Sequence, residues 1–284
     1  MRFDRRTQPE NEEDAACRIC GRVEDLTFEH VPPRSVGNRD RAEMLGIDAW
    51  LNRTEGGSTE RGTMSQRGSG VYTLCADCNN RAGRLYVPEL ANWTGAGNST
   101  LAQLEPSPLH FDTQLDPAYA YMKLRDLRPG RLMKQIATML LALVPGEFPP
   151  MHPELTRYAR VPEVTGLPPR YQFYLAFFLG PIARFNGGTA VWRESGGMAY
   201  TLELGYPPYA YILSIDEESP ALATGNITSF AELGIDQVAE IELQLQIGFG
   251  HTPLPLDLRS KAALERDRAL NESDSPDSPD SQGK

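Results

Sequence analysis

The chain has 284 residues, of which 40% are hydrophobic and 23% are charged, and its formal net charge at pH 7 is −10. This composition is typical of a globular protein and excludes a disordered chain, a strongly basic nucleic-acid coat and a disulfide scaffold. The length provides for one large domain or two modest ones. The acidic excess lies in the C-terminal part, so the low isoelectric point does not exclude a phosphate-binding site elsewhere.

No segment of the sequence is predicted to be a signal peptide or to cross a membrane. Residues 1–14, MRFDRRTQPENEED, are charged and contain no apolar signal-peptide core, and we expect them to be flexible. The apolar stretches at residues 136–144 and 173–183 are shorter than the roughly 20 residues that a transmembrane helix needs. Residues 259–284 are expected to form a short helix and a disordered acidic tail. These features predict a cytoplasmic protein without a membrane partner.

Residues 15–86 are predicted to form a first, small domain. Apolar and polar residues alternate from Leu26 to His30, which indicates a strand that ends before a pair of prolines. Residues 35–70 are rich in Gly, Arg, Ser and Asn and are interpreted as an inserted, partly flexible loop. Three further predicted elements are a helical candidate at Arg41–Leu51, a strand at Val71–Leu74 and a helix at Ala76–Leu85.

Residues 87–258 are predicted to form a second domain of unknown role, with helices first and strands after them. The predicted helices are Ala118–Leu127, Arg131–Val144 and Pro153–Arg160. Gly, Pro and Asn then separate five aromatic and aliphatic segments, as in an antiparallel meander: Tyr171–Leu179, Thr189–Arg193, Ala199–Leu204, Tyr209–Ile215 and Ile241–Ile247. The predicted fold class is therefore α+β, with a helical segment and an antiparallel β-meander after the N-terminal unit.

The four cysteines form two C-x2-C pairs, Cys17 with Cys20 and Cys75 with Cys78. Two residues between thiolates allow one tight turn to present both sulfurs to one ion, and two such turns complete a tetrahedral four-thiolate site. A single pair is also typical of redox dithiols, but two pairs that use every cysteine favour structural zinc. The inserted loop accounts for the long separation of the two pairs.

Two motifs accompany the cysteines: EHVPP, residues 29–33, follows the first pair, and CADCN, residues 75–79, contains the second. With these motifs, residues 15–86 resemble the HNH endonucleases, the nucleases with a ββα-metal fold, and in particular members with two zinc knuckles of the treble-clef type. The resemblance implies a metal-dependent endonuclease that hydrolyses DNA phosphodiester bonds. It also implies a bacterial or phage setting, such as defence or mobile elements.

The resemblance implies roles for three residues. His30 would be the general base, and Glu29 and Asn79 would be ligands of one Mg²⁺-type ion. The sequence departs from the family pattern in three ways. Glu29 stands where Asp is more usual, Asn79 stands where His is common, and no Asn precedes the second knuckle in GSGVYTL. Asn80 is the nearest candidate for the orienting role of that missing Asn.

Basic residues near these motifs are candidates for contacts with DNA phosphates, which require cations and no particular sequence. They are Arg34, Arg81 and Arg84. A second basic segment is either a solvated helical face or a further contact with the DNA backbone, and it contains Lys123, Arg125, Arg128, Arg131 and Lys134.

Two other interpretations of the whole chain stay open. The first is a non-catalytic zinc-binding module that recognises nucleic acid or protein. The second is a toxin-like effector whose C-terminal domain gates a nuclease. The remaining histidines are interpreted as structural, because each lies within three residues of a proline: His110, His152 and His251. The sequence leaves the oligomeric state open.

Overall fold

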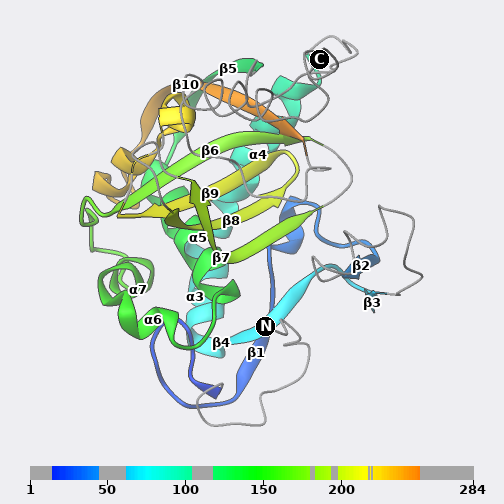
Figure 1. Ribbon diagram of the computed structural model, residues 1–284, viewed down its shortest axis with the longest axis vertical. Helices are drawn as coiled ribbons and strands as arrows, with labels where there is room; N and C mark the ends of the chain where they lie inside the picture. The colour runs from blue at the N-terminus through cyan, green and yellow to red at the C-terminus, as the bar shows by residue number, and fades with distance from the viewer. Residues whose placement is uncertain are drawn as a thin grey trace, which may run out of the picture.

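The computed structural model describes residues 15–44, 62–103, 118–179, 183–192, 198–216, 218 and 220–249. Within these ranges the fold consists of two small two-stranded sheets, one of them followed by a helix, and of a six-stranded mixed sheet that packs against helices (Figure 1). This arrangement confirms the predicted α+β class. The predicted flexible N-terminus and acidic tail lie outside the described residues.

The N-terminal unit consists of two antiparallel strands and a helix that begins where the second strand ends. Its elements are β1 (Leu26–His30), β4 (Gly70–Cys75) and α3 (Ala76–Leu85). The register places His30 opposite Gly70. A side chain is excluded at Gly70 because a Cβ atom there would lie 2.6 Å from the ring of Phe28. The strand, strand and helix that the sequence predicts in this unit are therefore confirmed.

The segment between β1 and β4 contains three short elements. They are the 3-10 helix η1 (Arg34–Val36) and two strands that pair with each other, β2 (Ala42–Met44) and β3 (Thr63–Ser65). The predicted helix at Arg41–Leu51 is wrong in its described part, because pairing with β3 places residues 42–44 in a strand. The rest of that predicted helix lies outside the described residues.

The large sheet has the strand order β5-β10-β6-β9-β8-β7. Its strands are β5 (Tyr119–Leu127), β6 (Tyr171–Leu179), β7 (Arg184–Trp192), β8 (Met198–Tyr206), β9 (Tyr209–Ile215) and β10 (Ala239–Phe249). Strands β7, β8 and β9 form the predicted antiparallel meander. Strand β10 corrects the prediction, because it lies between β5 and β6 and runs parallel to β6. Two parallel strands require a long connection between them, here from β6 to β10. Its last part contains two 3-10 helices, η2 (Pro220–Gly225) and η3 (Thr228–Glu232).

Helix α5 (Pro129–Leu143) lies at the centre of the fold. Every residue from Leu132 to Ala142 is buried, because helices and strands surround α5 on all sides. The other helices are α4 (Val87–Leu101), α6 (Phe148–Met151) and α7 (Pro153–Arg160). Helix α4 is not predicted from the sequence, because its glycines lower helix propensity. Gly97 is buried there against Tyr209, where a Cβ atom would lie 2.5 Å from the phenol ring.

Strand β5 replaces the helix that the sequence predicts at Ala118–Leu127. Exposed and buried side chains alternate over its first half, with Tyr121 exposed and Met122 buried. Antiparallel pairing with β10 holds the segment in the sheet. Lys123 therefore projects from a strand, and the predicted basic helical face does not form.

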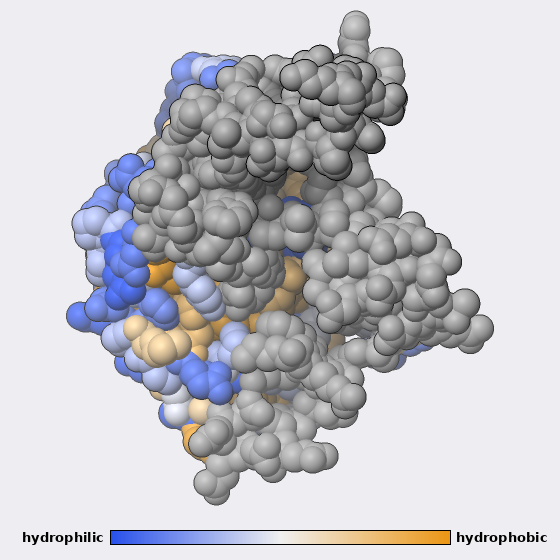
Figure 2. Space-filling model, viewed as in Figure 1, coloured by the Kyte–Doolittle hydropathy of each residue, from blue (hydrophilic) through white to orange (hydrophobic). Residues whose placement is uncertain are grey.

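The larger of two hydrophobic clusters in the described residues joins the N-terminal unit to the large sheet. This cluster of buried apolar residues contains Leu26 and Leu74 from the small sheet, Leu140 from α5 and Leu213 from β9. On the face shown in Figure 2, hydrophilic residues gather along the side where α7 lies, next to a smaller apolar area. The predicted boundary near residue 87 therefore crosses a continuous core, and its role as a domain boundary stays a prediction.

Candidate functional site

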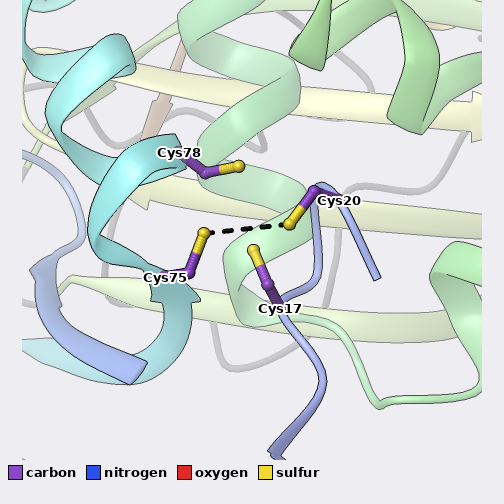
Figure 3. Close-up of side chains that lie close together, drawn as sticks. All are labelled: Cys17, Cys20, Cys75 and Cys78. Carbon is purple, nitrogen blue, oxygen red and sulfur yellow. Dashed lines mark hydrogen bonds between the residues drawn. The ribbon is translucent and has the colours of Figure 1, made fainter. Parts of the chain in front are cut away.

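The sulfur atoms of Cys17, Cys20, Cys75 and Cys78 point toward one another in one cluster (Figure 3). All four lie within 4.8 Å of one another, and the Sγ atoms of Cys20 and Cys75 are 3.8 Å apart. Four thiolates at Zn–S distances of about 2.3 Å form a tetrahedron with edges of about 3.8 Å. None of the four cysteines forms a disulfide. The cluster therefore has the donors and the spacing of a site for a metal ion such as zinc.

Two different turns present these sulfurs. In the first pair, the N–H of Cys17 donates to the carbonyl of Arg22 at 2.9 Å, and the N–H of Gly21 donates to the carbonyl of Cys17 at 2.8 Å. Gly21 has a φ of +72°, a left-handed conformation that favours glycine. In the second pair, Cys75 ends β4 and Cys78 lies in the first turn of α3. The strand-to-helix junction therefore sets the spacing of the second pair.

The thiols of Cys17 and Cys75 differ in acidity. A hydrogen bond with the Cys78 thiol lowers the pKa of Cys17 to about 5, whereas burial raises the pKa of Cys75 to about 12. Four sulfurs at this spacing repel one another as thiolates when no cation lies between them. A divalent cation at the centre of the cluster would favour the thiolate form of all four.

His30 lies at the opposite end of the β1–β4 hairpin from the cysteine cluster. Its ring packs edge-on against Phe28, with 4.8 Å between the ring centroids. His30 Nε2 lies 3.0 Å from the carbonyl oxygen of Arg67, and because a carbonyl only accepts, Nε2 carries the hydrogen. Burial lowers the pKa of His30, so the ring is neutral at pH 7 and Nδ1 is its basic nitrogen.

The carboxyl group of Glu29 is buried, with 8% of the residue exposed. Successive strand residues point to opposite faces, so Phe28 and His30 share one face of β1 while Thr27 and Glu29 share the other. Burial raises the pKa of Glu29 to about 8, and among the described residues none donates a hydrogen bond to it. Glu29 is therefore protonated at pH 7 unless a cation lies beside it.

Asn79 in α3 contacts strand β1 directly. Its Nδ2 donates to Thr27 Oγ1 at 2.9 Å and to the carbonyl of Phe28 at 3.4 Å. These bonds hold α3 against the face of β1 that carries Thr27 and Glu29. Among the described residues no donor binds the Oδ1 atom of Asn79, which leaves an oxygen available as a ligand. Asn80 is exposed and takes no part in this contact.

The three predicted phosphate contacts lie in different places. Arg34 is close enough to His30 to lower the pKa of its ring. Arg81 lies beside the cysteine cluster, where its Nη1 donates to the carbonyl of Arg160 at 2.9 Å and its side chain lines a pocket of about 420 Å³. Arg84 is exposed in the last turn of α3. The arginines therefore do not form one surface around His30.

Three residues of the second predicted basic segment, Lys123, Arg131 and Lys134, have partners within the protein. Lys123 on β5 forms ion pairs with Glu240 at 2.8 Å and Glu242 at 2.7 Å on β10. Arg131 donates to the carbonyls of Leu85 and Ile235. Lys134 is completely buried, and its ammonium donates to three backbone carbonyls, those of Tyr158, Val161 and Val164. Lys123, Arg131 and Lys134 therefore bind groups of the protein itself and do not form one continuous basic face.

Asn38, which is not among the predicted site residues, joins the two loops beside His30. Its Nδ2 donates to the carbonyl of Pro32 at 2.6 Å and to that of Ser69 at 2.7 Å, and its Oδ1 accepts from the N–H of Ser69 at 2.7 Å. Asn38 is 3% exposed although it lies in a polar segment. An Asn eight positions after His30, within the inserted loop, is the one sequence signal that could have identified it.

Within the described ranges, the cysteine cluster is the one group of three or more His, Cys, Asp or Glu side chains with the spacing of a metal site. Over the same ranges no helix has the length and apolarity that crossing a bilayer requires. No family model, curated protein or solved structure matches the chain. The functional interpretation therefore depends on the residues themselves.

Proposed function

We propose that the protein is a metal-dependent HNH-type endonuclease that hydrolyses DNA phosphodiester bonds. The observation that carries this proposal is the position of His30. It is the last residue of the first strand in a strand–strand–helix unit, and its ring is neutral and oriented by the carbonyl of Arg67. A neutral imidazole in this position is suited to accept a proton from an attacking water.

The other proposed site residues, Glu29 and Asn79, supply oxygen atoms on the face of β1 opposite to that of His30. Glu29 offers a buried carboxyl group, and Asn79 offers the Oδ1 atom of a side chain that α3 holds against the strand. These are the hard oxygen donors that a Mg²⁺-type ion prefers. When bound, such an ion stabilises charge on the phosphate and on the leaving oxygen. The positive charge would also lower the pKa of Glu29 and favour its carboxylate form.

Asn38 supports the nuclease interpretation. The HNH pattern includes a middle Asn with an orienting role, and the residues before the second knuckle lack one. Asn38 bonds the loop that follows His30 to the segment that enters β4. We assign the orienting role to Asn38 in place of Asn80.

The remaining features complete the proposal. The four cysteines hold a structural zinc that ties the first knuckle to the β4–α3 junction. Arg34 near His30 and the exposed Arg84 are the proposed contacts with DNA phosphates, and Arg81 is a contact at the zinc end of α3. A cytoplasmic setting, in defence or in mobile elements, fits this activity. Residues 87–258 have no proposed chemical role.

The alternative is a non-catalytic zinc-binding module that recognises nucleic acid or protein. Two observations favour it. Glu29 and His30 lie on opposite faces of β1, so their side chains do not converge on one ion. The amide group of Asn79 is already bonded to β1, as expected of a purely structural residue. A nuclease gated by its C-terminal region, as in a toxin-like effector, has no specific observation in its favour.

Cleavage of a supercoiled plasmid with Mg²⁺ or Mn²⁺ tests the proposal. We expect wild-type protein to nick the plasmid and the variant His30→Ala to be slower by about 10²–10⁴, the usual contribution of a general base. DNA affinity and zinc content should stay near wild type, because no cysteine or arginine changes. Binding without cleavage under either ion would support the binding module, and equal cleavage by His30→Ala would exclude His30 as the base.

A further inference from the structure

Arg22 contacts two of the four cysteine sulfurs. Its Nε donates to Cys20 Sγ at 3.4 Å, and its Nη2 lies 3.7 Å from Cys75 Sγ. These sulfurs belong to different C-x2-C pairs. The guanidinium therefore bridges the first knuckle and the β4–α3 junction at the point where their sulfurs are 3.8 Å apart.

The turn of the first knuckle and two acidic side chains hold Arg22 in this position. The carbonyl of Arg22 accepts the hydrogen bond that closes the turn at Cys17. Its Nη2 also forms ion pairs with Asp77 at 2.8 Å and Glu24 at 3.3 Å. A guanidinium is planar, carries five N–H donors and is always charged, so one side chain can bind sulfurs and carboxylates together.

The charge of the metal centre gives this contact a function. One Zn²⁺ and four thiolates carry a net charge of −2, and a neighbouring cation stabilises that excess. N–H donors stabilise a thiolate more than a neutral thiol, because the acceptor is charged. Groups that bond to the ligands of a metal also fix the orientation of those ligands.

We propose that Arg22 is a positioning residue of the metal centre: it holds Cys20 and Cys75 as a pair of thiolates and retains the zinc. The inference rests on the proposed zinc site. The competing interpretation is a surface ion pair with Asp77, since the side chains of Arg22 and Asp77 are 51% and 68% exposed. Exposed ion pairs contribute little, and this one alone would leave zinc affinity unchanged.

Zinc competition with a chromogenic chelator at pH 7 distinguishes the two interpretations. Removing a group that bonds to metal ligands typically weakens affinity by about 10–100-fold. Because Arg22 is half exposed, we expect Arg22→Gln to weaken zinc binding by about tenfold. Arg22→Lys should have a smaller effect, because an ammonium keeps the positive charge but lacks the planar set of N–H donors of a guanidinium. Arg160→Gln is the matched control, since Arg160 lines the same pocket beside Cys20.

Cobalt substitution provides a second readout. The sulfur-to-cobalt charge-transfer absorption reports the electron density on the thiolates, and we expect it to shift in Arg22→Gln and to stay in place in Arg160→Gln. Asp77→Asn removes one of the two ion pairs that hold Arg22 but keeps Glu24 and the N–H donors to the sulfurs, so its effect should be clearly smaller than that of Arg22→Gln.

Three outcomes would overturn the inference. The first is equal zinc affinity in Arg22→Gln and Arg160→Gln. The second is an effect of Asp77→Asn as large as that of Arg22→Gln. If Arg22→Gln fails to fold, the test uses Arg22→Lys instead. The third outcome is then a wild-type zinc affinity together with an unshifted cobalt spectrum in Arg22→Lys. Zinc-free wild-type protein that binds no cobalt would instead show that the proposed zinc site itself is wrong.

Discussion

Asn38 and Ser69 are bonded in both directions: the amide of Asn38 donates to the carbonyl of Ser69 and accepts from its N–H, each at 2.7 Å. The two residues are 31 positions apart in the chain. Ser69 also donates through Oγ to the carbonyl of Val31, directly after His30. One buried amide therefore determines how the chain leaves β1 and enters β4, and with it the position of His30.

Replacing Asn38 should disturb this loop pairing. In Asn38→Ala the carbonyls of Pro32 and Ser69 lose their amide donor, and we expect the free energy of unfolding to fall by about 2 kcal/mol. Plasmid cleavage should fall as well, because the loop after His30 is no longer fixed. Urea unfolding and cleavage assays measure the two effects, with Asn80→Ala as the control. Cleavage that falls equally in Asn80→Ala would assign the orienting role to Asn80 instead.

Glu29→Gln tests the proposed oxygen ligand without disturbing the fold. A glutamine has the shape of the protonated carboxyl group that burial favours at pH 7, so thermal unfolding should stay near that of wild type. The variant cannot supply a negative charge to a divalent ion, and cleavage with Mg²⁺ should be lost. Wild-type cleavage rates in Glu29→Gln would show that the carboxylate of Glu29 is not part of the site.

Metal analysis of the purified protein should find about one zinc per chain. Cys75→Ser leaves an incomplete thiolate shell, and because Cys75 and Cys78 belong to the common core, the loss of order should extend beyond the knuckles. We expect a lower unfolding temperature by circular dichroism and reduced hydrogen-exchange protection of β1, β4 and α3. A chelator should reproduce this effect in wild type and add little to the variant. Well-folded, zinc-free protein with four free thiols would contradict the prediction.

Lys134 should contribute strongly to stability although it carries a charge. Its ammonium binds three carbonyls and lies 3.9 Å from the centre of the Tyr158 ring. Lys134→Met would leave those carbonyls unpaired, and we expect the free energy of unfolding to fall by about 3 kcal/mol in a urea titration. Lys123→Met is the control, since Lys123 lies on the surface, and its effect should be much smaller. Equal effects would mean that the buried contacts of Lys134 do not stabilise the fold.

His152 should make stability depend on pH. The residue is buried, its Nδ1 lies 3.1 Å from Tyr171 Oη, and its ring packs against Phe148. Burial lowers the pKa of His152 below 6.5, although Asp216 and Glu154 nearby oppose this shift and Arg170 adds to it. Below pH 6.5 the unfolded chain therefore binds a proton that the native His152 does not, and stability falls as the pH falls.

The variant His152→Gln cannot titrate at this position, so it isolates this contribution. Relative to wild type, it should lose less stability between pH 6.5 and pH 5, as measured by urea unfolding at each pH. Burial also lowers the pKa of His30, so His30 contributes to the same pH dependence. The variant His30→Ala measures that second contribution in the same titration. Parallel curves for wild type and His152→Gln would exclude His152 as the source of the dependence.

The elements that the sequence determined by itself are those with strong local signals. The two C-x2-C pairs predict a four-sulfur cluster. Each pair can present two sulfurs to one ion from a single tight turn, and two such turns complete a tetrahedral site. Alternation from Leu26 to His30 predicts β1, and the turn residues around residues 205–208 separate β8 from β9. These patterns depend on neighbours along the chain, so they can be interpreted without the fold.

The tertiary structure alone decided the pairings between distant residues. Ala118–Leu127 has a helical composition, but pairing with β10 places it in a strand, and the crossover before β10 makes one pair of strands parallel. Lys134 is one charge among several in the sequence. Only its hydrogen bonds to three backbone carbonyls, which begin with that of Tyr158, explain why it is buried. Asn38 gains its role only when Ser69 lies beside it. Hydrogen bonds between segments far apart in the chain leave no periodic signal in the sequence, which is why these features required the structure.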